Sequence, residues 1–307
     1  MKTNISLILI LCLLLGACKN GNASSQNKSE TPQDTIKAIK MPAIPQMMTA
    51  PEQRADFLAK HYWDNVNFAD TNYIHHPDIT EQACDLLNHV PLETAQQAMR
   101  NVIDRTNVDK KVFTYITDLA DKYLYDPNSP MRNEEFYIPV LEAMIASPVL
   151  NETEKIRPQA RLKLAQKNRI GTKALNFTYT LASGAQGSLY QLKAEYLLLF
   201  INNPGCQACT ETIEGLKNAP IINQLLQEKK LVLLSIYPDE ELDEWKKHLS
   251  EFPNEWINGY DKKFTIKEEQ VYDLKAIPTL YLLDKDKTVL LKDATAPAIE
   301  AYLMQHQ

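Results

Sequence analysis

Cys206 and Cys209, separated by two residues, constrain this chain more than any other feature of its sequence. The apolar run Tyr196–Ile201 stands shortly before them, and Ile277-Pro278-Thr279 opens a second apolar run much later. This pattern predicts a buried strand that leads to a cysteine pair at the start of a helix. Such a pair indicates thiol–disulfide exchange.

The expected chemistry follows from the position of each sulfur. Unpaired N–H groups and the positive end of the helix dipole favour a thiolate, so we expect Cys206 to attack a disulfide in a partner. Cys209 would then resolve the mixed disulfide. Because the two residues between the sulfurs carry no cation and no proline, we expect an intermediate reduction potential. Pro278, as a cis proline, would remove a backbone N–H from the surface where a partner strand docks, with Ile277 and Thr279 beside it.

The N-terminus predicts export and a lipid anchor. Lys2 precedes an apolar run, residues 5–15, that is too short to span a bilayer, and the run leads to Leu15-Gly16-Ala17-Cys18. This motif resembles the lipobox of bacterial lipoproteins, which implies a signal peptide at residues 1–17 and lipidation of Cys18. The alternative is an ordinary secretory signal. Residues 18–47 predict a disordered tether after the lipidated cysteine.

Composition limits the classes of function. The 307 residues are 44% hydrophobic, so they can bury two modest cores, and the net charge of −6 comes without a basic stripe. Nucleic acid is therefore not an expected partner. After loss of the signal and lipidation of Cys18, only Cys84, Cys206 and Cys209 remain, too few for a framework of structural disulfides.

Two regions with different periodicity follow the tether. Apolar residues at helical spacing predict an all-α domain of unknown function over residues 48–170, with five or six short helices. From residue 171 to residue 307, strand-like and helical runs alternate after a hairpin near residues 176–184. This alternation predicts an α/β domain with a partly parallel sheet and helices on both faces. The hairpin turn is expected at Ser183-Gly184 and a short helix near residues 269–274.

The second region resembles a known family. Phe177-Thr178, the Ser183-Gly184 turn, the strand YLLLFI, C-x-x-C and Ile-Pro-Thr occur in the order seen in TlpA-like, membrane-anchored members of the thioredoxin superfamily. The resemblance covers roughly residue 173 to the C-terminus. It implies a thioredoxin-like fold with a central mixed sheet and an extra N-terminal hairpin, and thiol:disulfide oxidoreductase activity. The helical region resembles an uncharacterised domain that precedes such modules in Gram-negative envelope lipoproteins of the Bacteroides type.

Two positions differ from the family pattern. Gly205 stands where the family usually has an aromatic residue, and Phe200 stands where thioredoxins bury an acid that accepts a proton from the resolving thiol. Glu211 and Glu214 are the alternative proton acceptors close in sequence.

Other interpretations of these residues stay open. The cysteine pair could be half of a zinc site, an inert disulfide or a peroxidatic centre, although no second cysteine pair supplies zinc ligands. Cys84 fits a buried, inert thiol, and His75-His76 fits a solvated turn more closely than a metal site. Tyr62 and Trp63 fit a helical core.

The sequence thus predicts an envelope-anchored thiol:disulfide oxidoreductase that reduces selected disulfides in periplasmic proteins, without a cofactor or metal. Its partners would be protein thiols and disulfides, and the membrane through Cys18. The expected location is the periplasmic face of the outer membrane of a Gram-negative bacterium. The alternative is a scaffold lipoprotein, redox-inactive or redox-gated, whose helical domain binds a partner.

Overall fold

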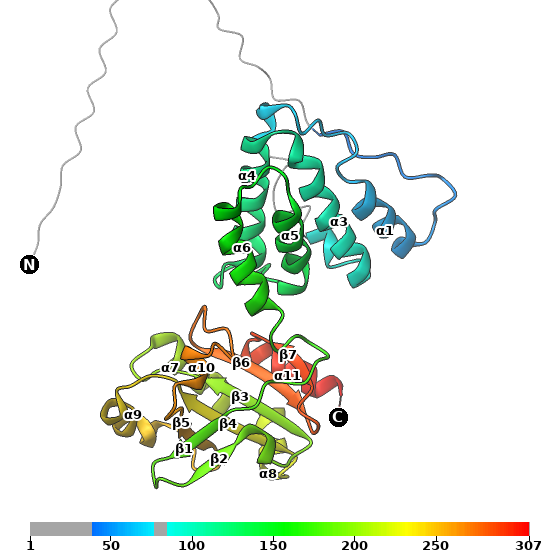
Figure 1. The fold of residues 1–307 in the computed structure, drawn as a ribbon. Helices are drawn as coiled ribbons and strands as arrows, with labels where there is room; N and C mark the ends of the chain where they lie inside the picture. Colours follow the sequence, from blue (N-terminus) through cyan, green and yellow to red (C-terminus); the bar gives the residue numbers. More distant parts are fainter. Residues whose placement is uncertain (1–38, 77–84, 307) are drawn as a thin grey trace, which may run out of the picture. The chain divides into compact units, whose positions relative to one another are not determined.

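The structure is a computed structural model that describes residues 39–76 and 85–306. Cys18 and Cys84, for which the sequence predicts lipidation and an inert thiol, lie outside these residues. The described residues belong to one compact unit, in which a helical region is followed by a sheet with flanking helices (Figure 1).

The helical region consists of short amphipathic helices around one apolar core. The apolar spacing of α3 and α4 predicts these helices, since their regularly spaced apolar side chains are the buried ones. Side chains also fix where helices begin: Asp109, Asn133 and Asn151 accept hydrogen bonds from the first free N–H groups of α4, α5 and α6. The elements are α1 (Pro51–His61), η1 (Thr71–Tyr73), α3 (Leu92–Arg105), η2 (Thr106–Val108), α4 (Lys110–Ala120), η3 (Asp121–Tyr125), α5 (Glu134–Ala146) and α6 (Glu152–Ala165).

The second region contains a mixed sheet of strand order β2-β1-β5-β4-β3-β6-β7. Strands β3, β4 and β5 are parallel neighbours, whereas β1/β2, β1/β5, β3/β6 and β6/β7 are antiparallel. The strands are β1 (Thr178–Leu181), β2 (Gln186–Ser188), β3 (Tyr196–Ile201), β4 (Leu231–Tyr237), β5 (Ile257–Tyr260), β6 (Thr279–Asp284) and β7 (Val289–Lys292). The expected thioredoxin-like fold with its extra hairpin, β1–β2, is confirmed.

Alternation along β3 produces a core on each face of the sheet. Leu198 and Phe200 face the side covered by α7 (Gln207–Lys217), α8 (Pro220–Gln227) and α11 (Ala296–Gln305). Leu197 and Leu199 face the other side, which is covered by α10 (Thr265–Glu268) and by non-helical chain before β3. The remaining elements are η4 (Leu189–Gln191), α9 (Leu242–His248) and η5 (Leu249–Glu251).

Two local predictions were wrong. The helix expected near residues 269–274 lies earlier, at Thr265–Glu268, and Gln270 has a φ of 50°, which ends helical geometry. Strand β5 was not predicted, because its Gly259 disfavours a strand by propensity. In the fold this glycine is required, since a Cβ there would lie 2.9 Å from the ring of Tyr179 on β1.

Candidate functional site

Cys206 lies at the first turn of α7, just beyond the C-terminal end of β3. It is the N-cap residue, and its sulfur accepts a hydrogen bond from the backbone N–H of Cys209 at 3.3 Å. Gly205 has a φ of 70°, a left-handed conformation that favours glycine, with open space around its Cβ position. Glycine stands here in place of the aromatic residue usual in the family, and it suits the left-handed backbone conformation of the loop. The sulfur of Cys206 meets both the free N–H groups and the positive end of the helix dipole.

Cys209 occupies a different environment, one turn further along α7. It is buried, with 2% of its surface exposed, whereas Cys206 is only partly buried, and both thiols are free. Burial first, and then its hydrogen bond to the Cys206 sulfur, raise the pKa of Cys209 to about 12, although a backbone hydrogen bond from Asn203 opposes the shift. Only Cys206 is thus both accessible and placed to react with a partner.

Ile277, Pro278 and Thr279 lie beside the cysteine pair, as the sequence predicts. Thr279 opens β6 and is opposite Ile201, the last residue of β3, so the sheet brings the two distant motifs together. The Ile277–Pro278 peptide bond is cis, and the thiol of Cys206 donates to the Ile277 carbonyl oxygen at 3.7 Å. The Thr279 hydroxyl donates to the Ala276 carbonyl oxygen at 2.6 Å.

The sequence leaves open which acid accepts the proton of the Cys209 thiol. Phe200 is fully buried in an edge-to-face contact with Trp256, and so provides packing at the position where thioredoxins bury an acid. Glu211 accepts from Gln207, and Glu214 pairs with Lys217, and both carboxylates lie on the exposed surface of α7. Neither arrangement brings a carboxylate to the buried sulfur.

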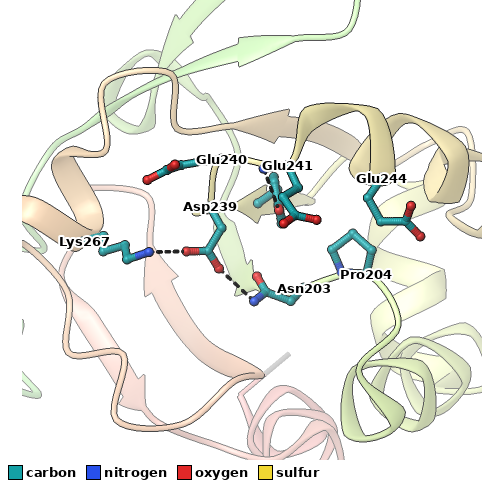
Figure 2. A pocket seen from close by; sticks show the side chains of 8 residues that line it. Asn203, Pro204, Asp239, Glu240, Glu241, Glu244 and Lys267 are labelled. Atoms are coloured by element: carbon teal, nitrogen blue, oxygen red, sulfur yellow. Dashed lines mark hydrogen bonds and ion pairs between the residues drawn. The ribbon is translucent and has the colours of Figure 1, made fainter.

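A polar cavity of about 460 Å³ flanks the loop that leads to Cys206 (Figure 2). Asp239 accepts from Asn203 of that loop at 2.8 Å and pairs with Lys267 at 2.8 Å. Burial opposes ionisation, but these two hydrogen bonds and the lysine charge lower the pKa of Asp239. Glu240, Glu241 and Glu244 complete its acidic wall. Sequence reasoning missed this cavity, because its residues come from three separate segments.

The structure also bears on His75 and His76, on metal binding and on membrane-spanning helices. His75 is exposed, but His76 is 3% exposed, so the expected solvated turn is wrong for the second histidine. Within residues 39–76 and 85–306, no three His, Cys, Asp or Glu side chains cluster in a way that could bind a metal ion. Over the same residues, no helix combines the length and apolar character needed to cross a bilayer.

Comparisons with known proteins agree with this fold. The family described as thioredoxin-like matches residues 194–289, and a domain of unknown function (DUF5106) matches residues 17–168. The crystal structure of a thioredoxin-like protein from Bacteroides caccae is 83% identical, with a TM-score of 0.86, over 89% of this chain and 100% of that chain.

Two further solved structures each match a little under half of this chain. The C-terminal domain of an uncharacterized protein from Bacteroides fragilis is 69% identical over 45% of this chain and 98% of that chain, with a TM-score of 0.44. A conserved protein of unknown function from the same species is 36% identical over 44% of this chain and 98% of that one, with a TM-score of 0.43. A comparison with curated proteins found no match.

The likeness to the Bacteroides caccae protein covers that protein's entire chain, and so extends over both the helical region and the sheet. This chain therefore belongs to the thioredoxin-like proteins, with a DUF5106 domain ahead of its thioredoxin-like fold.

Proposed function

We propose that this protein is a thiol:disulfide oxidoreductase that reduces selected disulfides in other envelope proteins. The Cys206 thiolate attacks one sulfur of the substrate disulfide, forms a mixed disulfide and releases the first substrate thiol. Cys209 loses its proton and attacks the sulfur of Cys206, which releases the second substrate thiol and leaves a Cys206–Cys209 disulfide. Two electrons and two protons pass to the substrate, and a dithiol reductant returns the pair to its starting state.

One observation carries the proposal: the accessible sulfur of Cys206 lies at a helix N-terminus within 3.7 Å of the Ile277 carbonyl oxygen, with a buried thiol one turn away. The helix end stabilises negative charge on the attacking sulfur. Burial keeps the second sulfur from reacting with solvent before a mixed disulfide has formed.

The redox state of an oxidising compartment supports the proposed direction of the reaction. An oxidising compartment forms disulfides without this protein, so a protein of this type contributes most by reducing or repairing incorrect ones. We place it in the envelope of a Gram-negative bacterium, with a lipid on Cys18 at the periplasmic face of the outer membrane. Cys18 lies outside the described residues, and its lipidation is tested by the mass of the mature N-terminal peptide.

The test compares three variants for reduction of the interchain disulfides of insulin with dithiothreitol as reductant. Cys206→Ser should abolish the protein-dependent rate. Cys209→Ala, reduced beforehand and mixed with insulin after removal of dithiothreitol, should accumulate a mixed disulfide through Cys206, visible as added mass. Cys84→Ser serves as the control and should retain the full rate. A Cys206→Ser variant as active as the wild type would overturn the mechanism. A pair that dithiothreitol cannot reduce would favour the scaffold function instead.

A further inference from the structure

A buried ionic cluster joins the helical region to the segment that leads into the Ile277–Pro278 loop. Lys275, two residues before Ile277, pairs with Glu134 at 3.1 Å, Asp293 at 3.1 Å and Asp273 at 3.3 Å. Its side chain is 8% exposed and that of Glu134 is 12% exposed. Burial alone would lower the pKa of Lys275, but the three carboxylates together raise it above its usual value, so the lysine stays charged.

Glu134 is the central contact of this cluster, because each of its two carboxylate oxygens meets a different lysine. One oxygen pairs with Lys275, and the other pairs with Lys292 of β7 at 2.5 Å. Glu134 itself is the first residue of α5 and belongs to the helical region. A neutral residue in place of Glu134 would remove one partner from each lysine. Lys275 would keep Asp273 and Asp293, so the change weakens its link to the helical region without leaving it unpaired.

Further contacts from the helical region reach the same segment. Lys167 donates to the carbonyl oxygens of Glu269 and Gln270, at 3.2 and 2.5 Å, and Asn168 donates to that of Val271 at 2.7 Å. The carbonyl oxygens of residues 269–271 and the side chain of Lys275 thus contact the helical region. The segment continues directly into Ile277, which contacts the sulfur of Cys206.

We propose that the helical region, through Glu134 and Lys275, positions the Ile277–Pro278 loop for docking of a polypeptide disulfide beside Cys206. Glu134 and Lys275 are positioning residues, since neither contacts a reacting sulfur. The helical region is thus part of the apparatus that docks a polypeptide substrate. This inference rests on the proposed function. The whole-length match with the Bacteroides caccae crystal structure supports it, because the superposition extends over both regions.

The test uses the isosteric variant Glu134→Gln in the full chain, with two substrates: a disulfide-bonded peptide and a small aromatic disulfide. For the peptide, KM should rise about threefold to tenfold with kcat little changed, because docking and not sulfur chemistry is impaired. For the small disulfide, the value of kcat/KM should fall much less than for the peptide. Backbone amide exchange of residues 269–279 should accelerate in the same variant.

Two controls separate positioning from loss of stability. Glu142→Gln makes the same change on the same helix, but its partner Arg100 lies within the helical region. Ser147→Ala removes a buried hydroxyl that donates to Asn107 within that region, and so weakens the fold at the end of α5 opposite Glu134. Both should keep the KM of the wild type and its amide exchange at residues 269–279.

An unchanged peptide KM in Glu134→Gln, or an equal rise in both controls, would overturn the positioning role. Wild-type protein without any disulfide reductase activity would remove the proposed function instead. In that case amide exchange decides: acceleration only in Glu134→Gln supports positioning of the loop, and equal exchange in all variants contradicts it. Should Glu134→Gln not fold, Lys275→Met tests the same contact from the other side.

Discussion

Cys206 and Cys209 differ in exposure, and under the proposed mechanism this difference sets which sulfur attacks and which resolves. Their spacing in the sequence predicts a working pair, but the spacing alone does not reveal how deeply Cys209 is buried. The same holds for Phe200: the sequence shows that an acid is absent, whereas only the fold shows that Trp256 fills the space with an aromatic contact. Phe200 therefore supplies packing and no proton acceptor at this position.

The raised pKa of Cys209 predicts a strong pH dependence for the resolving step. Because the thiolate attacks and the pKa is about 12, the thiolate fraction increases throughout the range from neutral pH upward. Release of an aromatic thiol from its mixed disulfide with Cys206 should accelerate about tenfold per pH unit from near neutral to mildly alkaline pH. Stopped-flow absorbance measures this release, and Cys209→Ala should show none. A plateau below pH 9 would contradict the assignment.

Helices and strands were predicted most reliably where residues close together in the sequence specify the local structure. Strand β3 was predicted from a continuous apolar run, and α3 from apolar residues at helical spacing, both of which are local patterns. The N-terminus of α8 lacks a cap from its own sequence. Pro220 occupies its first turn without an N–H, and Ala219 has no side chain that can accept a hydrogen bond.

The N-terminus of α8 is capped from another element. The carboxylate of Glu300 in α11 accepts from the backbone N–H groups of Ile221 at 2.7 Å and Ile222 at 3.0 Å. We expect Glu300→Ala to lower the free energy of unfolding by about 1–2 kcal/mol, as loss of an N-cap does. Urea denaturation followed by circular dichroism measures the change, with the exposed Glu255→Ala as the control. Equal stability of the two variants would show that the cap contributes nothing.

At the scale of the whole molecule, the helical region and the sheet are joined by polar contacts from the short stretch after α6. Asn168 is 3% exposed, has a φ of 50°, donates to the Val271 carbonyl oxygen and accepts from the N–H of Leu175 at 2.7 Å. Asparagine tolerates this left-handed conformation better than most residues. Asn168 can therefore adopt the conformation that the turn requires and also make the two hydrogen bonds.

Asn168→Ala should lower the free energy of unfolding by about 1–3 kcal/mol, because it leaves two partly buried backbone groups without their partner. Lys229→Ala is the matched control, since Lys229 has a φ of 57° but is exposed. Thermal and urea unfolding of both variants measures the difference. If Asn168→Ala were no less stable than the control, these two hydrogen bonds would not stabilise the contact between the helical region and the sheet.

The sequence by itself determined the cysteine pair, the strand before it, the distant Ile-Pro-Thr and the change from helical to alternating periodicity. These features depend on residues near one another in the chain, where spacing and propensity act directly. The tertiary structure alone decided the burial of Cys209, the shifted helix α10 and the contact of Glu134 with Lys275. These depend on side chains that are far apart in sequence, and a buried charge or thiol acquires its properties from neighbours that only folding brings together.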